Sequence, residues 1–271
     1  MVNNMVTEID YAEVPKIKDV VLIQGIAPGV GYIGRNVAGY LVSELKAKKF
    51  AELYSDALPP VVNVDHNGSG LIITMKYELY YVKGDKKKKQ KDMVIVVGDA
   101  QSMTTEGYYE IARSILEFLE EMFGIKEVIS IGGFGTGMLV EKRKPHVYGA
   151  ANNEKYLRLF EKLGVKFKNT EVTQIVGAAG VIVGEATRME IDAVCLMGET
   201  SGLLLSDPKA TEAVLEVLNQ YLNLDLDLSK IQEHVKEVEK VLKKIDEMQK
   251  KAFTQLMKKK EGDDEHLGYI G

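Results

Sequence analysis

The spacing of glycines gives the sequence its first candidate for chemistry. Gly29-Val30-Gly31-Tyr32-Ile33-Gly34 matches the G-x-G-x-x-G pattern, in which glycines let the backbone approach a pyrophosphate at the start of a helix. The match is incomplete, because Ile26-Ala27-Pro28 separates the preceding strand from the first glycine and the segment 49–54 is a poor candidate for the second strand. The alternative is a tight strand-to-helix crossing, where glycine permits positive φ and close packing. We therefore assign no cofactor to this segment.

A second set of candidates follows two other predicted strands. Gly132-Gly133-Phe134-Gly135-Thr136-Gly137 comes after the strand 126–131, where a loop could hold an anion or a nucleoside, or serve only as a flexible packing loop. Glu199 follows the strand 192–197 and could act as a catalytic carboxylate, or cap the loop and pair with Arg188. No acid, base or nucleophile with a partner can be assigned, so we expect no catalytic residue. A nucleoside- or nucleotide-processing enzyme remains the alternative function.

The side chains that bind metals are not grouped in this sequence. Its four histidines and its single cysteine are widely scattered, without the short spacings that hold a metal ion. Cys195 lies inside the apolar run Ala193-Val194-Cys195-Leu196-Met197, which predicts a buried, inert thiol. A chain with one cysteine forms no internal disulfide, which fits a reducing, cytoplasmic environment. We predict neither a metal nor a cofactor.

Composition argues against several further classes of function. The 271 residues are 45% hydrophobic and 28% charged, which suffices for a stable core and argues against wholesale disorder. A net charge of −5 disfavours nucleic acid as a partner. The lysine-rich segment 84–91 is therefore expected to be a solvated loop, with a phosphate or nucleic-acid contact as the alternative. No apolar run reaches the roughly 18 residues of a membrane span and the first residues do not resemble a signal peptide, so we expect no membrane partner.

The elements that must position these residues alternate between strands and helices. After a polar lead-in, residues 1–18, a buried strand spans 19–25 and a helix spans about 33–48. Asn152 and Asp207 are expected to cap helices. The other predicted elements are a strand from 61, a hairpin of 71–82 and 92–98, helices at 105–122, 153–163, 181–189 and 208–221, and strands at 126–131, 146–148 and 192–197. This order predicts an α/β fold with a mostly parallel sheet flanked by helices.

A change of pattern after residue 227 marks a separate C-terminal element. Positions with alternating spacings of four and three, as in a coiled-coil seam, are occupied by Ile231, Val235, Val238, Leu242, Ile245, Gln249, Ala252 and Leu256. Gln249 could set the register, and we expect the seam to mediate homo-oligomerisation through a helix at 228–258. The alternative is a terminal helix packed on its own domain. Residues 259–271 form a polar tether with a small apolar tip.

Four short motifs carry a resemblance to a known family over about residues 18–230. They are Pro28-Gly29-Val30-Gly31-Tyr32-Ile33-Gly34 with Ala38-Gly39-Tyr40-Leu41, Gly98-Asp99-Ala100-Gln101, Gly177-Ala178-Ala179-Gly180, and Cys195-Leu196-Met197-Gly198-Glu199-Thr200 with Asp207-Pro208-Lys209-Ala210. In this order and spacing they resemble the proteasome assembly chaperone family, and its archaeal members most. The resemblance implies a nucleoside-phosphorylase-like fold without that enzyme's activity.

The same resemblance implies a partner. Family members bind the α-ring of the proteasome core particle and assist its assembly or activation, and the archaeal ones form homo-oligomers. Their tails often end in a hydrophobic residue, a tyrosine and any residue, and enter pockets between adjacent α subunits. This chain departs from that pattern, because its tyrosine is third from the end, and its candidate partner-binding residues are Leu267, Tyr269, Ile270 and Gly271. The expected organisation is a lead-in at 1–18, an α/β domain at 19–227, the helix at 228–258 and a tail at 259–271.

Overall fold

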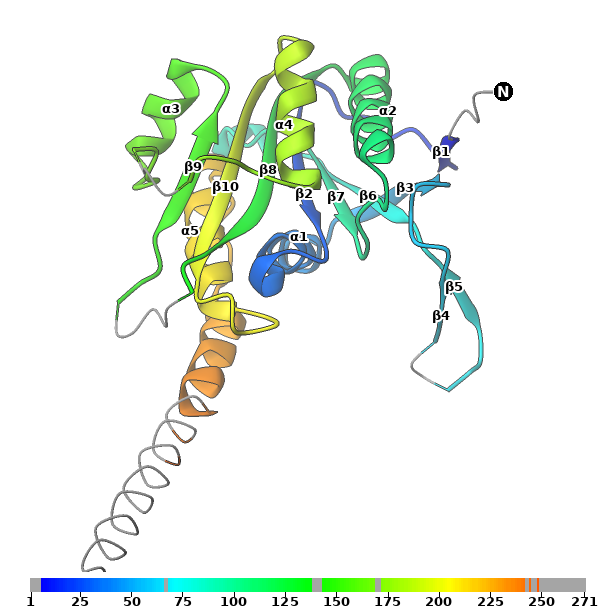
Figure 1. The fold of residues 1–271 in the computed structure, drawn as a ribbon. Helices are drawn as coiled ribbons and strands as arrows, with labels where there is room; N and C mark the ends of the chain where they lie inside the picture. The colour runs from blue at the N-terminus through cyan, green and yellow to red at the C-terminus, as the bar shows by residue number, and fades with distance from the viewer. Residues whose placement is uncertain are drawn as a thin grey trace, which may run out of the picture. The chain divides into compact units, whose positions relative to one another are not determined.

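The computed structural model describes residues 6–65, 68–137, 143–168 and 172–241, together with Lys244 and Met248. The chain divides into two units, Met1–Asp227 and Leu228–Gly271. The first unit holds one large β-sheet with helices on both faces (Figure 1). In the second unit, residues 229–241 are helical.

Eight strands form the large sheet, in the order β1-β3-β6-β7-β2-β8-β10-β9. Their bounds are Thr7–Tyr11 (β1), Val20–Ile26 (β2), Lys48–Ser55 (β3), Tyr77–Val82 (β6), Met93–Gly98 (β7), Ile125–Gly135 (β8), Val147–Ala151 (β9) and Asp192–Thr200 (β10). All seven residues of β2 are buried, as its continuous apolar and β-branched run predicts for a strand covered on both faces. The core of the first unit therefore lies on both sides of β2.

The sheet is mixed, so the prediction of a mostly parallel sheet is wrong. The pairs β7–β2, β2–β8 and β8–β10 are parallel. The pairs β1–β3, β3–β6, β6–β7 and β10–β9 are antiparallel. Parallel neighbours need a long crossover connection, whereas the short segment between β6 and β7 permits only an antiparallel pair. The α/β character of the prediction is confirmed, and the parallel part is limited to the centre of the sheet.

Two segments near the N-terminus differ from the prediction. The stretch 1–18, expected to be a lead-in, contains β1, which pairs with β3 at the edge of the sheet. The segment 49–54, a poor strand by sequence, forms most of β3. Its polar residues hide the strand signal because they make ion pairs along the sheet: Lys49 Nζ lies 3.1 Å from Glu78 Oε1, and Lys76 Nζ lies 2.7 Å from Glu52 Oε1.

Five helices cover the two faces of the sheet. Their bounds are Ile33–Glu44 (α1), Thr105–Phe123 (α2), Glu154–Glu161 (α3), Ala178–Arg188 (α4) and Pro208–Leu222 (α5). Helices α2 and α4 pack together on one face, and α1 and α5 pack together on the other (Figure 1). The N-cap of α5 is Asp207, as predicted, but the N-cap of α3 is Asn153 rather than Asn152. The side chain of Asn152 instead accepts a hydrogen bond from the backbone N–H of Ala193 in β10, at 2.9 Å.

The predicted hairpin of 71–82 and 92–98 is confirmed only in its second half. β6 pairs with β7, but the preceding strand, β5 (Ile72–Thr74), pairs with β4 (Val62–Val64) in a separate two-stranded sheet. We call residues 61–74 the arm. In Figure 1 the arm extends away from the large sheet.

No helix within the described part of the chain has the length and apolarity that are needed to span a bilayer.

Candidate functional site

The parallel strands of the sheet all have their C-terminal ends on one side, which we call the sheet edge. The four sequence motifs lie at or beside this edge. β2 ends at Ile26, β7 at Gly98, β8 at Gly135 and β10 at Thr200. In α/β proteins this edge is the usual place for a ligand. The space that the glycine-rich segments leave open therefore decides what this edge can bind.

The first glycine motif packs directly against the sheet. A β-carbon on Gly34 would lie 2.5 Å from the carbonyl oxygen of Ile131, and one on Gly25 would overlap the carbonyl group of Gly34. Gly31 has a φ of 63°, in the left-handed region that favours glycine. Strand β2 and helix α1 therefore cross at backbone distance. This favours the close-packing interpretation of the G-x-G-x-x-G segment over a pyrophosphate cradle.

The second glycine segment is only partly a loop. β8 continues to Gly135, so the prediction of a loop over 132–137 is wrong for its first four residues. Gly132 and Gly133 pair with Met197 and Gly198 of β10. A β-carbon on Gly133 would overlap the carbonyl oxygen of Val30, because the segment after β2 lies directly on β8. The chain's own backbone thus occupies the space through which a phosphate would approach Gly133.

The carboxamide of Gln101 links three of the motifs. Its Nε2 donates a hydrogen bond to the carbonyl oxygen of Pro28, and its Oε1 accepts one from the backbone N–H of Ala178 at 3.0 Å. The second bond satisfies an N–H group at the start of α4, where a helix would otherwise attract an anion. Gly177 is required beside it, because a β-carbon there would overlap Gln101 Oε1 and its φ is +77°. The Gly-Asp-x-Gln motif is therefore a connection between the segment after β2 and helix α4.

Asp207 connects the remaining motif to the same edge. Its Oδ2 accepts a hydrogen bond from Thr200 Oγ1 at 2.6 Å, and its Oδ1 accepts one from the backbone N–H of Ala210 at 3.0 Å. Its backbone N–H donates to the carbonyl oxygen of Gly31 at 2.9 Å. The end of β10, the start of α5 and the glycine turn after β2 are thereby held together. The four motifs form one hydrogen-bonded cluster of polar groups that satisfy each other.

Glu199, the candidate catalytic carboxylate, is paired with a residue that the sequence did not indicate. Both carboxylate oxygens accept hydrogen bonds from Arg143, at 2.7 and 2.6 Å, and Oε2 also accepts one from the backbone N–H of His146 at 2.8 Å. Burial alone would raise the pKa of Glu199, but these bonds outweigh it and lower the pKa. Arg188 instead pairs with Glu185, at 3.1 Å. A carboxylate held ionised by an arginine is poorly suited to accept a proton.

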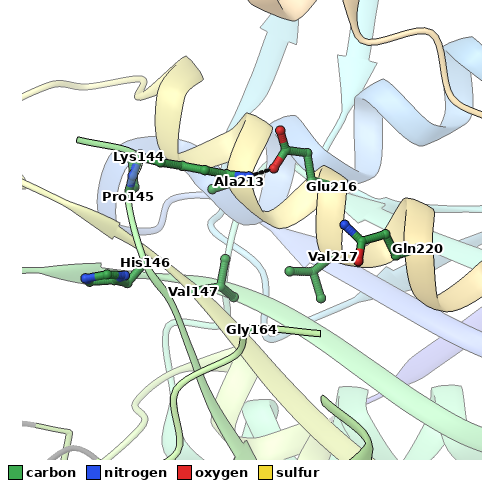
Figure 2. A pocket seen from close by; sticks show the side chains of 9 residues that line it. All are labelled: Lys144, Pro145, His146, Val147, Gly164, Ala213, Glu216, Val217 and Gln220. Atoms are coloured by element: carbon green, nitrogen blue, oxygen red, sulfur yellow. Dashed lines mark ion pairs between the residues drawn. The ribbon is translucent and has the colours of Figure 1, made fainter. Parts of the chain in front are cut away.

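A shallow hollow of about 250 Å³ lies beside this edge, between α5 and the segment that leads into β9 (Figure 2). Lys144 and Glu216 form an ion pair at its rim, and His146, Val147 and Val217 line it. Burial, followed by the nearby charges of Lys166 and Arg143, lowers the pKa of His146, so its imidazole is neutral at pH 7. In Figure 2 the imidazole of His146 points away from Val217 and Glu216, and the carboxylate of Glu216 is already paired with Lys144.

A buried polar cluster lies at the opposite end of β8, and the sequence analysis missed it. Glu127 is buried inside a strand, and its carboxylate accepts hydrogen bonds from the hydroxyls of Tyr156 and Tyr221 and pairs with Lys91. Burial raises the pKa of both tyrosines, so they remain protonated donors. The signal in the sequence is a glutamate within an apolar strand, because a buried charge requires partners. Lys88 of the same lysine-rich loop pairs with Asp225, so this loop is tied to the body rather than only solvated.

The single thiol and the acidic groups give no further site among the described residues. Cys195 is fully buried in β10, as predicted, and burial raises its pKa to about 11, so it is an unreactive thiol. Within the described ranges no group of three or more His, Cys, Asp or Glu side chains is placed to hold a metal ion.

The predicted oligomerisation and partner-binding residues lie in the second unit. Ile231 is buried, and Val235 and Val238 are half-buried along the helical residues 229–241. Leu242, Ile245, Gln249 and Leu256 lie outside the described residues, as do the tail residues Leu267, Tyr269, Ile270 and Gly271. The seam and the tail therefore stay predictions.

Comparison with known proteins places this arrangement of motifs in a family. The model of the PAC2 family matches residues 9–246. The chain belongs to the PAC2 family. The resemblance to the proteasome assembly chaperones that the motifs carry is thereby confirmed, and the hydrogen-bonded cluster at the sheet edge shows how these motifs contact each other in a PAC2 chain.

Relatives of this PAC2 chain include proteins of known structure. An uncharacterized protein of Methanocaldococcus jannaschii is 33% identical over 259 residues, which cover 96% of this chain and 95% of that protein. The crystal structure of PbaB of Pyrococcus furiosus, described as an archaeal proteasome activator, is 33% identical with a TM-score of 0.80, and the match covers 89% of this chain and 98% of PbaB. PbaA of the same organism, described as an archaeal homolog of proteasome-assembly chaperone, is 25% identical with a TM-score of 0.70, over 94% and 98% of the two chains.

Proposed function

We propose that this protein is a non-enzymatic, homo-oligomeric chaperone or adaptor of the cytoplasm that binds the α-ring of the proteasome core particle and assists its assembly or activation. The observation that carries the proposal is the likeness to PbaB, which extends over 98% of that proteasome activator at 33% identity. PbaA, described as a homolog of a proteasome-assembly chaperone, supports the same role. Both relatives share the whole body of the molecule rather than a single motif.

The geometry at the sheet edge supports binding to a macromolecule over catalysis on a nucleotide. The glycines that suggested a nucleotide cradle are in contact with the chain's own backbone, at Gly34 and Gly133. The N–H of Ala178 at the start of α4 is already bonded to Gln101. The one carboxylate that suggested acid–base chemistry, Glu199, is held ionised by Arg143. An enzyme that used this edge would need open space and free polar groups there, and these contacts occupy both.

In the proposed mechanism the C-terminal tail makes the contact with the core particle. Tyr269 and Ile270 are an apolar tip on a polar tether, and Gly271 follows them. A flexible tail can bury one aromatic ring in a pocket between subunits. Several tails on one oligomer would raise the overall affinity through their effective concentration. Leu267 would extend the apolar contact by one side chain.

The experiment mixes the full-length protein with purified core particle and separates the complexes on native gels. We expect a complex with the wild-type chain, and its loss when residues 267–271 are deleted or when Tyr269→Ala is made. Glu265→Ala, a change in the same tether outside the apolar tip, is the matched control and should bind as the wild type does. Absence of any complex with the wild-type chain would refute the proposed partner, and unchanged binding after the deletion would refute the role of the tail.

A further inference from the structure

The arm at residues 61–74 has the composition of a core strand pair but is exposed to solvent. Its six large apolar side chains are between 44% and 67% exposed: Val61, Val62, Val64, Leu71, Ile72 and Ile73. Every described residue of the arm except Asp65 is exposed, so neither face of the ribbon packs on the body. A two-stranded ribbon with strands of three residues is at best marginally stable in water. The arm therefore needs a covering surface that the described part of the chain does not supply.

Both faces of the arm carry exposed apolar side chains. The register places Val64 opposite Ile72 and Val62 opposite Thr74, so these side chains share a face because residues two apart point the same way. Asn63 and Ile73 form the pair on the other face. Neither strand carries a lysine, which is the usual protection of an exposed strand edge. Both the edges and the two faces of the arm are therefore open to a partner.

The body carries a second exposed apolar patch of matching chemistry, at the edge where β2 and β10 end. It consists of Val30, Leu203 and Leu205, which are 43%, 71% and 78% exposed. Val30 lies close to the segment that holds Leu203, because a β-carbon built on the adjacent Gly202 would lie 3.8 Å from Val30 Cγ1. The arm follows β3, which runs in the same direction as the parallel strands, so it leaves the sheet at this same edge.

We propose that the arm packs on a second copy of this chain, with apolar side chains of both its faces at the contact, Val64 and Ile72 among them, and with the patch of Val30, Leu203 and Leu205 as part of the covered surface. This goes beyond the proposed function, which places self-association on the seam of the second unit. It does not depend on the proteasome role.

The low charge of the arm and its apolar area favour a second copy of the chain, rather than a transiently bound protein, as the partner of the arm. Asp65 is the single Asp, Glu, Lys or Arg between residues 57 and 75, in a chain that is 28% charged. Permanent interfaces are more apolar than those of partners that come and go. At about 100 Å² for a fully exposed aliphatic side chain, the arm and patch of two copies together present roughly 1,000 Å² of apolar surface. That reaches the roughly 1,000 Å² that a biological interface needs when the side chains on both faces of the arm are counted.

The test compares the oligomeric mass of full-length variants by size-exclusion chromatography with light scattering, over a hundredfold range of concentration. Val64→Ser combined with Ile72→Ser removes the cross-strand apolar pair, and we expect its dissociation constant for self-association to rise at least tenfold. Leu159→Ser, an exposed apolar residue of α3 at the far side of the sheet, is the matched control and should behave as the wild type does. Circular dichroism should show the same helix content for all three proteins, since none of the three substituted positions lies in the core.

A second measurement reports on the arm itself. Hydrogen exchange of the backbone amides at 62–64 and 72–74 should be slow in the wild-type oligomer and fast in the double variant, because the isolated ribbon does not protect them. The proposal is overturned if the wild-type chain is monomeric throughout the range, or if the double variant keeps the wild-type mass and protection. It is also overturned if the double variant keeps its mass but loses the complex with core particle, since the arm would then contact the client. The native-gel result for the tail deletion is independent of all three outcomes.

Discussion

At the scale of single residues, the side chains that suggested chemistry serve to hold the chain together. Gln101 is the clearest case, because its carboxamide forms hydrogen bonds with two different segments. Its Nε2 donates to the carbonyl oxygen of Pro28, and its Oε1 accepts from the backbone N–H of Ala178. Asp207 does the same between Thr200 and the first turn of α5. Polar residues that satisfy each other in this way leave few groups for a ligand. The short motifs that identify the PAC2 family can thus be explained by the fold, independently of any reaction.

Replacement of Gln101 tests this assignment. Gln101→Glu preserves the shape and keeps an acceptor for the N–H of Ala178, but it has no donor for Pro28 and places a carboxylate beside that carbonyl oxygen. We expect a loss of about 1–2 kcal/mol in the free energy of unfolding, because one carbonyl loses its partner. Urea denaturation of the full-length protein measures it. Gln232→Glu, on an exposed position of the helical residues 229–241, should change the free energy by less than about 0.5 kcal/mol. Equal stability of the two variants would contradict the connecting role.

At the scale of elements, glycines determine how closely the segments at the sheet edge approach each other. β2, α1 and β8 meet at backbone distance through Gly25, Gly34 and Gly133. This differs from a ligand-binding loop, where the glycines would face open space. The distinction can be measured, because a methyl group added to such a glycine collides with backbone that cannot move aside.

Gly133→Ala and Gly184→Ala make a matched pair of substitutions. The β-carbon at Gly133 would overlap the carbonyl oxygen of Val30, so we expect Gly133→Ala to cost about 3 kcal/mol or more of stability. At Gly184, on the exposed side of α4, no atom lies near the added carbon, so Gly184→Ala should stabilise the protein by about 0.5–1 kcal/mol. Thermal or urea unfolding followed by circular dichroism would show the opposite signs. If Gly133→Ala folded with wild-type stability, the close-packing interpretation would be wrong, and the segment would have room for a ligand.

Some of these elements could be predicted from the sequence alone, and others could not. Continuous apolar runs identified β2 and the start of β8, and Asp207-Pro208 identified the start of α5, because burial and capping leave local signals. β3 was missed because its charges pair across strands, at Glu78 and Lys76. The partner of Glu199 was missed because Arg143 comes from a segment 56 residues away, and no local pattern records that distance. Residues 72–74 were assigned to the hairpin with 92–98 but pair with β4, because the composition of a strand does not state which strand it pairs with.

At the scale of the whole molecule, the chain combines a body whose polar motifs are self-satisfied with surfaces that are left apolar. Such surfaces are typical of sites that contact another protein. The proposed function and the proposed arm contact meet here, because an oligomer presents several copies of its tail at once. The affinity for a ring of α subunits would then depend on the number of copies as well as on the tail of each.

This dependence gives the last prediction, which concerns avidity. The double variant Val64→Ser, Ile72→Ser has an intact tail, so each of its copies should still bind core particle, but one tail at a time. Linked binding sites typically raise the overall affinity by a factor of 10² to 10⁴, so we expect the double variant to bind at least about tenfold more weakly than the wild-type oligomer. Solution binding to fluorescently labelled core particle, at concentrations where light scattering shows separated copies, measures the ratio. Leu159→Ser should bind as the wild type does. Deletion of 267–271 should weaken binding further, because no tail remains on any copy. If the separated copies bound as tightly as the oligomer, one tail would account for the whole affinity, and self-association would serve another purpose.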